Sequence, residues 1–165
     1  MRVLGIIGWS GSGKTTLITA LIPLLHASGT SVSTIKHAHH GFDMDRPGKD
    51  SHRHRSAGAR EVLVASAERW ALLHENDDGE PGLEALLERL APVDLVLVEG
   101  FKGHSHPKIE VHRPAAGRTP LWTNDRDVVA VASDALLPAC DRPVLPLNDP
   151  AGVTRWLLAF LASHH

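Results

Sequence analysis

Short apolar runs alternate along this chain with segments whose apolar residues recur at helical spacing. The runs predict strands at residues 3–7, 31–36, 61–65, 69–73, 95–98, 108–112, 128–132 and 144–145. Helical spacing follows the first run from about Lys14, and further helices are predicted at residues 82–90 and 150–162. The alternation is typical of an α/β fold, in which a mostly parallel central sheet carries helices on both faces.

Residues that end or start helices support these boundaries. Gly29 is placed to end the first helix, and Asp149 with Pro150 forms a cap followed by proline at the first helical position. Residues 95–98 are apolar on both faces, which predicts a central strand. Residues 61–65 and 69–73 are close enough in sequence to form an antiparallel pair.

A glycine-rich segment joins the first predicted strand to the first predicted helix. It matches the phosphate-loop pattern G-x-x-x-x-G-K-[ST], and the residues expected to bind a nucleotide are Gly8, Ser10, Gly11, Ser12, Gly13, Lys14, Thr15 and Thr16. Glycines let the backbone wrap a polyphosphate with its N–H groups pointing inward, and the helix N-terminus favours the negative charge. We therefore expect a nucleoside triphosphate with Lys14 on its phosphates and Thr15 on Mg²⁺.

Composition narrows the class of protein. A chain of 165 residues, 42% hydrophobic and 22% charged, predicts one soluble domain over residues 1–165. A net charge of −2 gives no general attraction to nucleic acid or to an anionic membrane, and no apolar run has the length of a membrane span. Because Cys140 is the only cysteine, no intramolecular disulfide is possible, and we expect a cytoplasmic protein.

Two acidic residues flank the apolar run at 95–98. The metal-binding acid of a phosphate-loop protein must lie at the carboxyl edge of the parallel sheet, where the loop itself lies. At about 3.3 Å per residue, Asp94 would be about 16 Å from that edge. Glu99 is therefore the expected catalytic acid, either in the Mg²⁺ shell or positioning the attacking water.

A polar segment at residues 37–60 follows the second predicted strand. Its histidines are His37, His39, His40, His52 and His54. A transition-metal site is one interpretation, but no cysteine is nearby and solvated or phosphate-facing histidines are the commoner case. The basic residues of this region, Lys36, Lys49, Arg53, Arg55 and Arg60, suit either a second anionic ligand or a solvated basic surface.

Four segments in this order give a specific resemblance. They are the phosphate loop at 8–16, Lys36-His37-Ala38-His39-His40, Pro47-Gly48-Lys49-Asp50-Ser51 with Ala57-Gly58-Ala59, and Val98-Glu99-Gly100-Phe101-Lys102. Together they resemble the molybdopterin-guanine dinucleotide biosynthesis protein B family, and the likeness extends through Ala132-Ser133-Asp134 and residues 146–149. The resemblance implies a homodimeric phosphate-loop protein that binds GTP and has weak GTPase activity.

The resemblance also implies partners. Members assist the guanylyltransferase that attaches GMP to molybdopterin during molybdenum cofactor synthesis. Among Asp43, Asp45 and Asp50, it favours Asp50 as a second carboxylate near Mg²⁺. Two interpretations of Lys36, Lys49, Asp50 and Arg53 stay open: they grip a second anion, which would be molybdopterin phosphate or an acidic surface of the partner, or their segment closes on the γ-phosphate of GTP as a switch. Two other classes stay open: a small-molecule kinase with an arginine-rich lid, and a GTP-dependent metal-delivery chaperone.

The residues that recognise the base cannot be identified from a motif. No Asn-Lys-x-Asp sequence is present, so Thr123-Asn124-Asp125, Asp134 and Asn148 are unranked candidates, and the preference for GTP comes from the resemblance alone. Residues 100–122 form a long connection with a strand-like run at 108–112. We expect this run to be an exposed strand edge that a homodimer covers. No function is assigned to His164 and His165.

Overall fold

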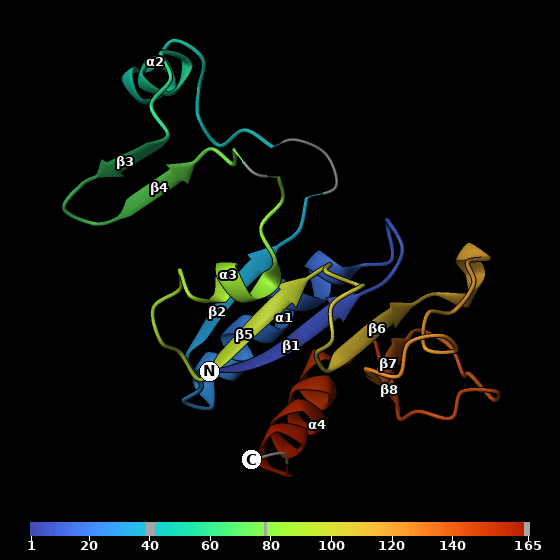
Figure 1. Ribbon diagram of the computed structural model, residues 1–165. Coiled ribbons are helices and arrows are strands. Elements are labelled where there is room, and N and C mark those ends of the chain that lie inside the picture. Colours follow the sequence, from blue (N-terminus) through green and yellow to red (C-terminus); the bar gives the residue numbers. More distant parts are fainter. Residues whose placement is uncertain (39–41, 78, 164–165) are drawn as a thin grey trace. The chain divides into compact units, whose positions relative to one another are not determined.

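The structure is a computed structural model that describes residues 1–38, 42–77 and 79–163 (Figure 1). The chain divides into two compact units, one formed by residues 1–37 with 86–165 and the other by residues 38–85. The single domain expected over residues 1–165 remains a prediction, because two compact units of one chain can belong to one domain. His39, His40, His164 and His165 lie outside the described residues.

A parallel sheet forms the centre of the first unit. Its strands are β1 (Arg2–Ile7), β2 (Val32–Lys36), β5 (Leu95–Glu99), β6 (Lys108–His112), β7 (Val128–Ser133) and β8 (Val144–Pro146). Their order is β2-β5-β1-β6-β7-β8, and every neighbouring pair is parallel. The predicted α/β fold is confirmed, and the carboxyl ends of these strands share one edge of the sheet.

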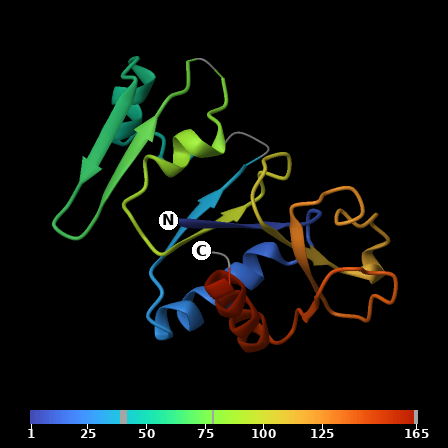
Figure 2. The same cartoon turned by 60° about the horizontal axis from the view of Figure 1, so that its bottom comes forward.

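Two helices, α1 (Lys14–Ala27) and α4 (Pro150–Ser163), lie side by side (Figure 2). Leu21 of α1 and Leu157 of α4 are fully buried in one cluster with Leu4 of β1. Burying an aliphatic side chain of this size contributes about 1.5–3 kcal/mol, so this layer anchors both helices to the sheet.

The sequence signals for the helix ends are confirmed. Gly29 has φ 81°, and its N–H donates to His26 O while Thr30 N–H donates to Leu25 O, a pairing that closes α1. At the start of α4, Asp149 accepts the Gly152 N–H at 3.0 Å.

On the other face of the sheet, β6 carries buried polar and charged side chains. Lys108, Glu110 and His112 point to this face and are buried, as is Trp122 from the segment that follows η1 (Pro114–Ala116). Because β6 pairs with both β1 and β7, the expectation that residues 108–112 form an exposed edge is wrong. The alternation of charged and apolar residues in β6 is the pattern of a half-exposed strand. Here the charged residues Lys108 and Glu110 are buried because the 113–127 connection supplies their hydrogen-bond partners.

The second unit contains α2 (Asp50–Ser56), a helix that was not predicted, and the predicted antiparallel pair of β3 (Glu61–Ala65) and β4 (Trp70–His74). Arg55 joins its parts through ion pairs to Asp43 at 2.9 Å and Glu75 at 3.2 Å. The short helix α3 (Leu83–Leu87) spans the boundary in sequence between the units. It is shorter than expected because tighter i→i+3 turns continue to Leu90. Within the described residues, no helix has the length and apolar character that crossing a membrane requires.

Asp94 ties the amino ends of β2 and β5 together. Its Oδ2 accepts the Ser31 hydroxyl at 2.6 Å and the Ser31 N–H at 2.8 Å. These hydrogen bonds from the side chain and backbone of Ser31 lower the pKa of Asp94 below its ordinary value. The carboxylate therefore stabilises the folded chain at pH values above the pKa of an unfolded aspartate, about 3.9.

We expect Asp94→Asn to lower the urea midpoint of unfolding at pH 7. Since the folded pKa is depressed, the stabilisation is complete above the unfolded pKa and is lost as the pH falls through the folded pKa. The difference between wild type and Asp94→Asn should therefore shrink between pH 5 and pH 3. Glu88→Gln, at an exposed position, is the control. Equal midpoints at pH 7, or a gap that does not change with pH, would contradict this role.

Candidate functional site

The phosphate loop lies between the carboxyl end of β1 and the start of α1. Gly8 has φ 147°, and a Cβ there would lie 2.5 Å from Val111 O, so the loop passes too close to β6 for a side chain. Gly13 has φ 102° and caps α1 in the left-handed region. Glycine at these positions lets the loop turn tightly into the helix, whose first N–H groups then point toward the loop.

Lys14 spans the curve of this loop. Its Nζ donates to Gly8 O at 3.2 Å and to Trp9 O at 3.0 Å. Burial lowers the pKa of Lys14, and the Glu99 carboxylate opposes that shift while Lys102 and Lys36 add to it. A polyphosphate in the loop would offset both the burial and the repulsion from Lys102 and Lys36, because its negative charge stabilises the charged form of Lys14.

The two predicted Mg²⁺ ligands are in direct contact. Thr15 Oγ1 donates to the Glu99 carboxylate, at 2.8 Å from Oε1 and 3.0 Å from Oε2. Lys36 Nζ lies 3.8 Å from the same carboxylate, whose side chain is only 13% exposed. A hydroxyl and a carboxylate are the hard oxygen donors that Mg²⁺ uses together with phosphate oxygens and water, so this pair fits the ion.

Strand pairing explains how Glu99 reaches Thr15. Glu99 ends β5 beside Ile6 of β1 on one side and Lys36 of β2 on the other. The next residue, Gly100, has φ 98°, and a Cβ there would lie 2.9 Å from His37 Cβ. Glycine therefore lets the chain leave β5 close to β2 without displacing the Glu99 carboxylate.

Asp94 lies where the strand-length argument placed it. It precedes β5 and bonds to Ser31 at the amino edge of the sheet, whereas Thr15 and Glu99 meet at the carboxyl edge. The choice of Glu99 over Asp94 is thus supported by the geometry.

Arg113 is a residue of this edge that sequence reasoning missed. It follows β6, and its Nε donates to Ser12 O in the phosphate loop at 3.0 Å. Its guanidinium also pairs with Asp134, which directly follows β7. Knowledge of the strand order was needed to find it, because only then does a basic residue after β6 lie beside the phosphate loop.

The same order ranks the candidates for base recognition. Asp134 follows β7, and Asn148 lies two residues beyond the end of β8, so both are on the carboxyl side of the sheet. Asn124 and Asp125 precede β7, and Asp125 is paired with Lys108. Asp134 is the candidate that connects to the phosphate loop, through Arg113.

The residues expected to grip a second anion are divided between the units. Lys36 is in the first unit beside Glu99, while Lys49, Asp50 and Arg53 are in the second. Arg53 lies 3.9 Å from Asp50 across one turn of α2, and both side chains are exposed. Arg55 and Arg60 pair instead with carboxylates of their own unit.

The histidine-based metal interpretation finds no support in the part of the chain that the structure describes. Among residues 1–38, 42–77 and 79–163, no group of His, Cys, Asp and Glu side chains is arranged to hold a metal ion by itself. His39 and His40 lie outside these ranges, and Mg²⁺ at Thr15 and Glu99 would take its remaining ligands from phosphate and water.

Comparison with known proteins gives consistent results. Residues 3–134 match the family model described as molybdopterin guanine dinucleotide synthesis protein B. The chain is 44% identical over 163 residues to the molybdopterin-guanine dinucleotide biosynthesis adapter protein of Escherichia coli, covering 96% of this chain and 93% of that protein. It is 45% identical over 148 residues to the adapter protein of the same name from Haemophilus influenzae, covering 88% and 82%.

A solved structure agrees with these matches. The crystal structure of a MobB protein homolog from Bacillus stearothermophilus superposes with a TM-score of 0.75 at 25% identity. That match covers 99% of this chain and 100% of the other.

Proposed function

Since this chain belongs to the molybdopterin guanine dinucleotide synthesis protein B family, we propose that it is a GTP-binding adapter in the synthesis of molybdopterin-guanine dinucleotide. The observation that carries the proposal is the hydrogen bond from Thr15 of the phosphate loop to Glu99. It joins the phosphate-binding segment to a carboxylate that is only 13% exposed and is placed for a metal.

Each residue of the site then has a role. Lys14 exchanges its bonds to Gly8 O and Trp9 O for phosphate oxygens. Thr15 and Glu99 hold Mg²⁺, which supplies charge neutralisation on the phosphates when bound. The Gly100 N–H donates to Ile6 O at 3.2 Å, so it belongs to the sheet rather than to a phosphate.

Guanine selection is assigned to Asp134. A carboxylate accepts hydrogen bonds from the two neighbouring N–H donors of guanine, and adenine presents no such pair of donors. The Asp134 side chain is 25% exposed and is held by Arg113, which also contacts Ser12 of the phosphate loop. The base of a nucleotide whose phosphates occupy the loop would lie within reach of this pair.

The proposal includes slow GTP hydrolysis and assistance to a guanylyltransferase that attaches GMP to molybdopterin. For Lys36 in the first unit, and separately for Lys49, Asp50 and Arg53 in the second, we propose contact with an anionic group, either molybdopterin phosphate or an acidic partner surface.

Nucleotide binding is tested by fluorescence titration with Mg²⁺ and GTP. Trp9 lies inside the phosphate loop and is 37% exposed, so binding should change its emission, and Trp9→Phe should remove that change. Lys14→Ala should weaken GTP binding by about 10- to 100-fold, since hydrogen bonds to charged groups contribute about 1.5–3 kcal/mol. Unchanged affinity in a folded Lys14→Ala protein would contradict the proposed site.

The same titration with other nucleotides tests the base assignment. Wild type should prefer GTP over ATP. Asp134→Asn should lose affinity for GTP and gain affinity for XTP, because an amide donates to the extra carbonyl of xanthine. If Asp134→Asn keeps the wild-type preference, another residue recognises the base.

The rate of GTP hydrolysis tests whether Glu99 or Asp94 is the acid of the site. The wild-type rate should be far below the typical enzyme turnover of about 10 per second. Glu99→Gln should reduce hydrolysis by a larger factor than it reduces the affinity for Mg²⁺-GTP, whereas Asp94→Asn should hydrolyse GTP like wild type. A greater loss in Asp94→Asn would overturn the assignment of Glu99.

A homodimer is also part of the proposal. The β3–β4 hairpin exposes Leu63 and Trp70, at 61% and 66%, beside the half-exposed Leu72. Such a face needs a cover. It supports self-association better than residues 100–122, whose strand β6 is internal.

Light scattering at tens of micromolar should give wild type the mass of two chains. The double variant Leu63→Lys with Trp70→Lys should be a monomer, because two buried cations would disrupt the interface. Leu136→Lys, at another exposed leucine, should remain a dimer. A monomeric wild type would refute the dimer.

A further inference from the structure

Strand β6 buries two charged side chains that the phosphate site does not use. Lys108 is 1% exposed and Glu110 is fully buried, both on the face away from α1 and α4. Burying a charge costs several kcal/mol unless it is paired and hydrogen-bonded. The hydrogen-bond partners of Lys108 and Glu110 therefore show which part of the structure these buried charges stabilise.

Both charges hold one segment of chain against the sheet. Glu110 accepts the N–H groups of Leu121 at 3.0 Å and of Trp122 at 2.9 Å. Lys108 Nζ donates to Asp125 at 2.9 Å and lies 3.6 Å from Asp127. Residues 119–125 are thus held by buried charges at Leu121, Trp122 and Asp125, although they form no regular secondary structure.

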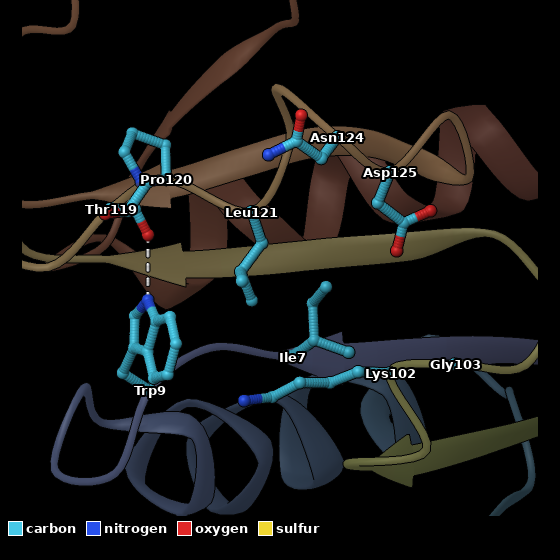
Figure 3. A pocket seen from close by; sticks show the side chains of 9 residues that line it. All are labelled: Ile7, Trp9, Lys102, Gly103, Thr119, Pro120, Leu121, Asn124 and Asp125. Carbon is cyan, nitrogen blue, oxygen red and sulfur yellow. Dashed lines mark hydrogen bonds between the residues drawn. The ribbon is translucent and has the colours of Figure 1, made fainter.

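This segment is one wall of a pocket of about 350 Å³ (Figure 3). Ile7, at the end of β1, and Lys102 lie on the opposite side, and Trp9 of the phosphate loop closes one end. The Trp9 Nε1–H donates to Thr119 O at 2.8 Å, which joins the wall to the phosphate loop. The volume is within the range of small-molecule pockets, about 300–1,000 Å³.

The apolar and polar residues that line the pocket lie in different parts of it. Pro120 and Leu121 offer apolar contact to a flat ring, and Asn124 and Asp125 offer amide and carboxylate oxygens on the 119–125 wall. Each Asp125 oxygen already accepts one hydrogen bond and retains a second lone pair.

Positive charge gathers at the Trp9 end. Lys102 Nζ lies 4.8 Å from the centre of the Trp9 ring, and the Arg118 guanidinium carbon lies 5.8 Å from it. Among the residues that the structure describes, neither cation has an ion pair with a carboxylate within 4 Å. These groups are positioned to receive an anionic substituent.

We propose that this pocket binds a planar aminopyrimidinone heterocycle that carries an anionic group. The ring lies against Pro120 and Leu121, its amino and amide N–H groups face Asn124 and Asp125, and its anion faces Lys102 and Arg118. The inference rests on the proposed function, because pterin and guanine both have this edge and both belong to the dinucleotide named for the relatives.

Occupancy of the pocket is coupled to the phosphate loop through Trp9. The Trp9 ring contributes to the pocket, while Trp9 O accepts a hydrogen bond from the Lys14 ammonium. A ligand in the pocket and phosphates in the loop therefore act on the same residue from two sides.

The test is a titration of the full-length protein with 6-carboxypterin, followed by the fluorescence of the pterin. The titration is done with and without a saturating non-hydrolysable GTP analogue. One pterin should bind per chain in both cases. Lys102→Met and Asn124→Leu should each weaken binding by about tenfold, the loss of one strong hydrogen bond. Arg126→Met, an exposed cation next to Asp125 that does not line the pocket, should bind like wild type.

A competition experiment decides whether the pocket is specific for pterin or also accepts guanine. GMP added to the analogue-saturated protein displaces the pterin if the pocket also accepts guanine, and leaves it bound if the pocket is specific for pterin; either result supports the shared chemistry. The proposal is overturned if 6-carboxypterin does not bind wild type, or if it binds Lys102→Met and Leu121→Trp as tightly as wild type. Failure of the GTP analogue to bind would instead refute the proposed function, and the titration without nucleotide would still decide the pocket.

Discussion

The hydrogen bond between Thr15 and Glu99 depends on a single constraint, the parallel direction of β1 and β5. Because both strands run the same way and pair from Arg2 with Leu95 to Ile6 with Glu99, the residues that follow them meet at one edge. Reversing β5 would bring Asp94 to the loop and place Glu99 at the far edge. The chemistry of the site is therefore fixed by strand direction and by a five-residue strand length.

The same edge organises the rest of the first unit. Lys36 follows from β2, Arg113 from β6 and Asp134 from β7, and the strand order places Arg113 next to the phosphate loop. Lys108 and Glu110, on the face of β6 away from α1 and α4, hold the 119–125 segment. Strand β6 therefore supports both the phosphate site, through Arg113, and the wall of the pocket beside Trp9. The arrangement concentrates positive charge around Lys14, whose pKa is lowered chiefly by burial.

Much of this site could be predicted from the sequence because its signals are local. The phosphate loop is contiguous, and the distance along a strand was enough to favour Glu99 over Asp94. Arg113 and the pocket beside Trp9 could not be found in this way, since they depend on which strands are neighbours. The error at residues 108–112 has the same origin: alternating charge looks like solvent exposure unless Asp125 and the Leu121 N–H are known to be its partners. In the second unit, the antiparallel pair followed from local pattern, while the ion pairs of Arg55 did not.

A crystal structure of the protein with Mg²⁺ and a non-hydrolysable GTP analogue tests the central claim most directly. The account predicts that the Thr15 hydroxyl coordinates Mg²⁺, that Glu99 coordinates the ion directly or through a bound water, and that Lys14 has left Gly8 O for phosphate oxygens. A metal bound at Asp94, or phosphates bound away from residues 8–16 with the Thr15–Glu99 hydrogen bond unchanged, would contradict it.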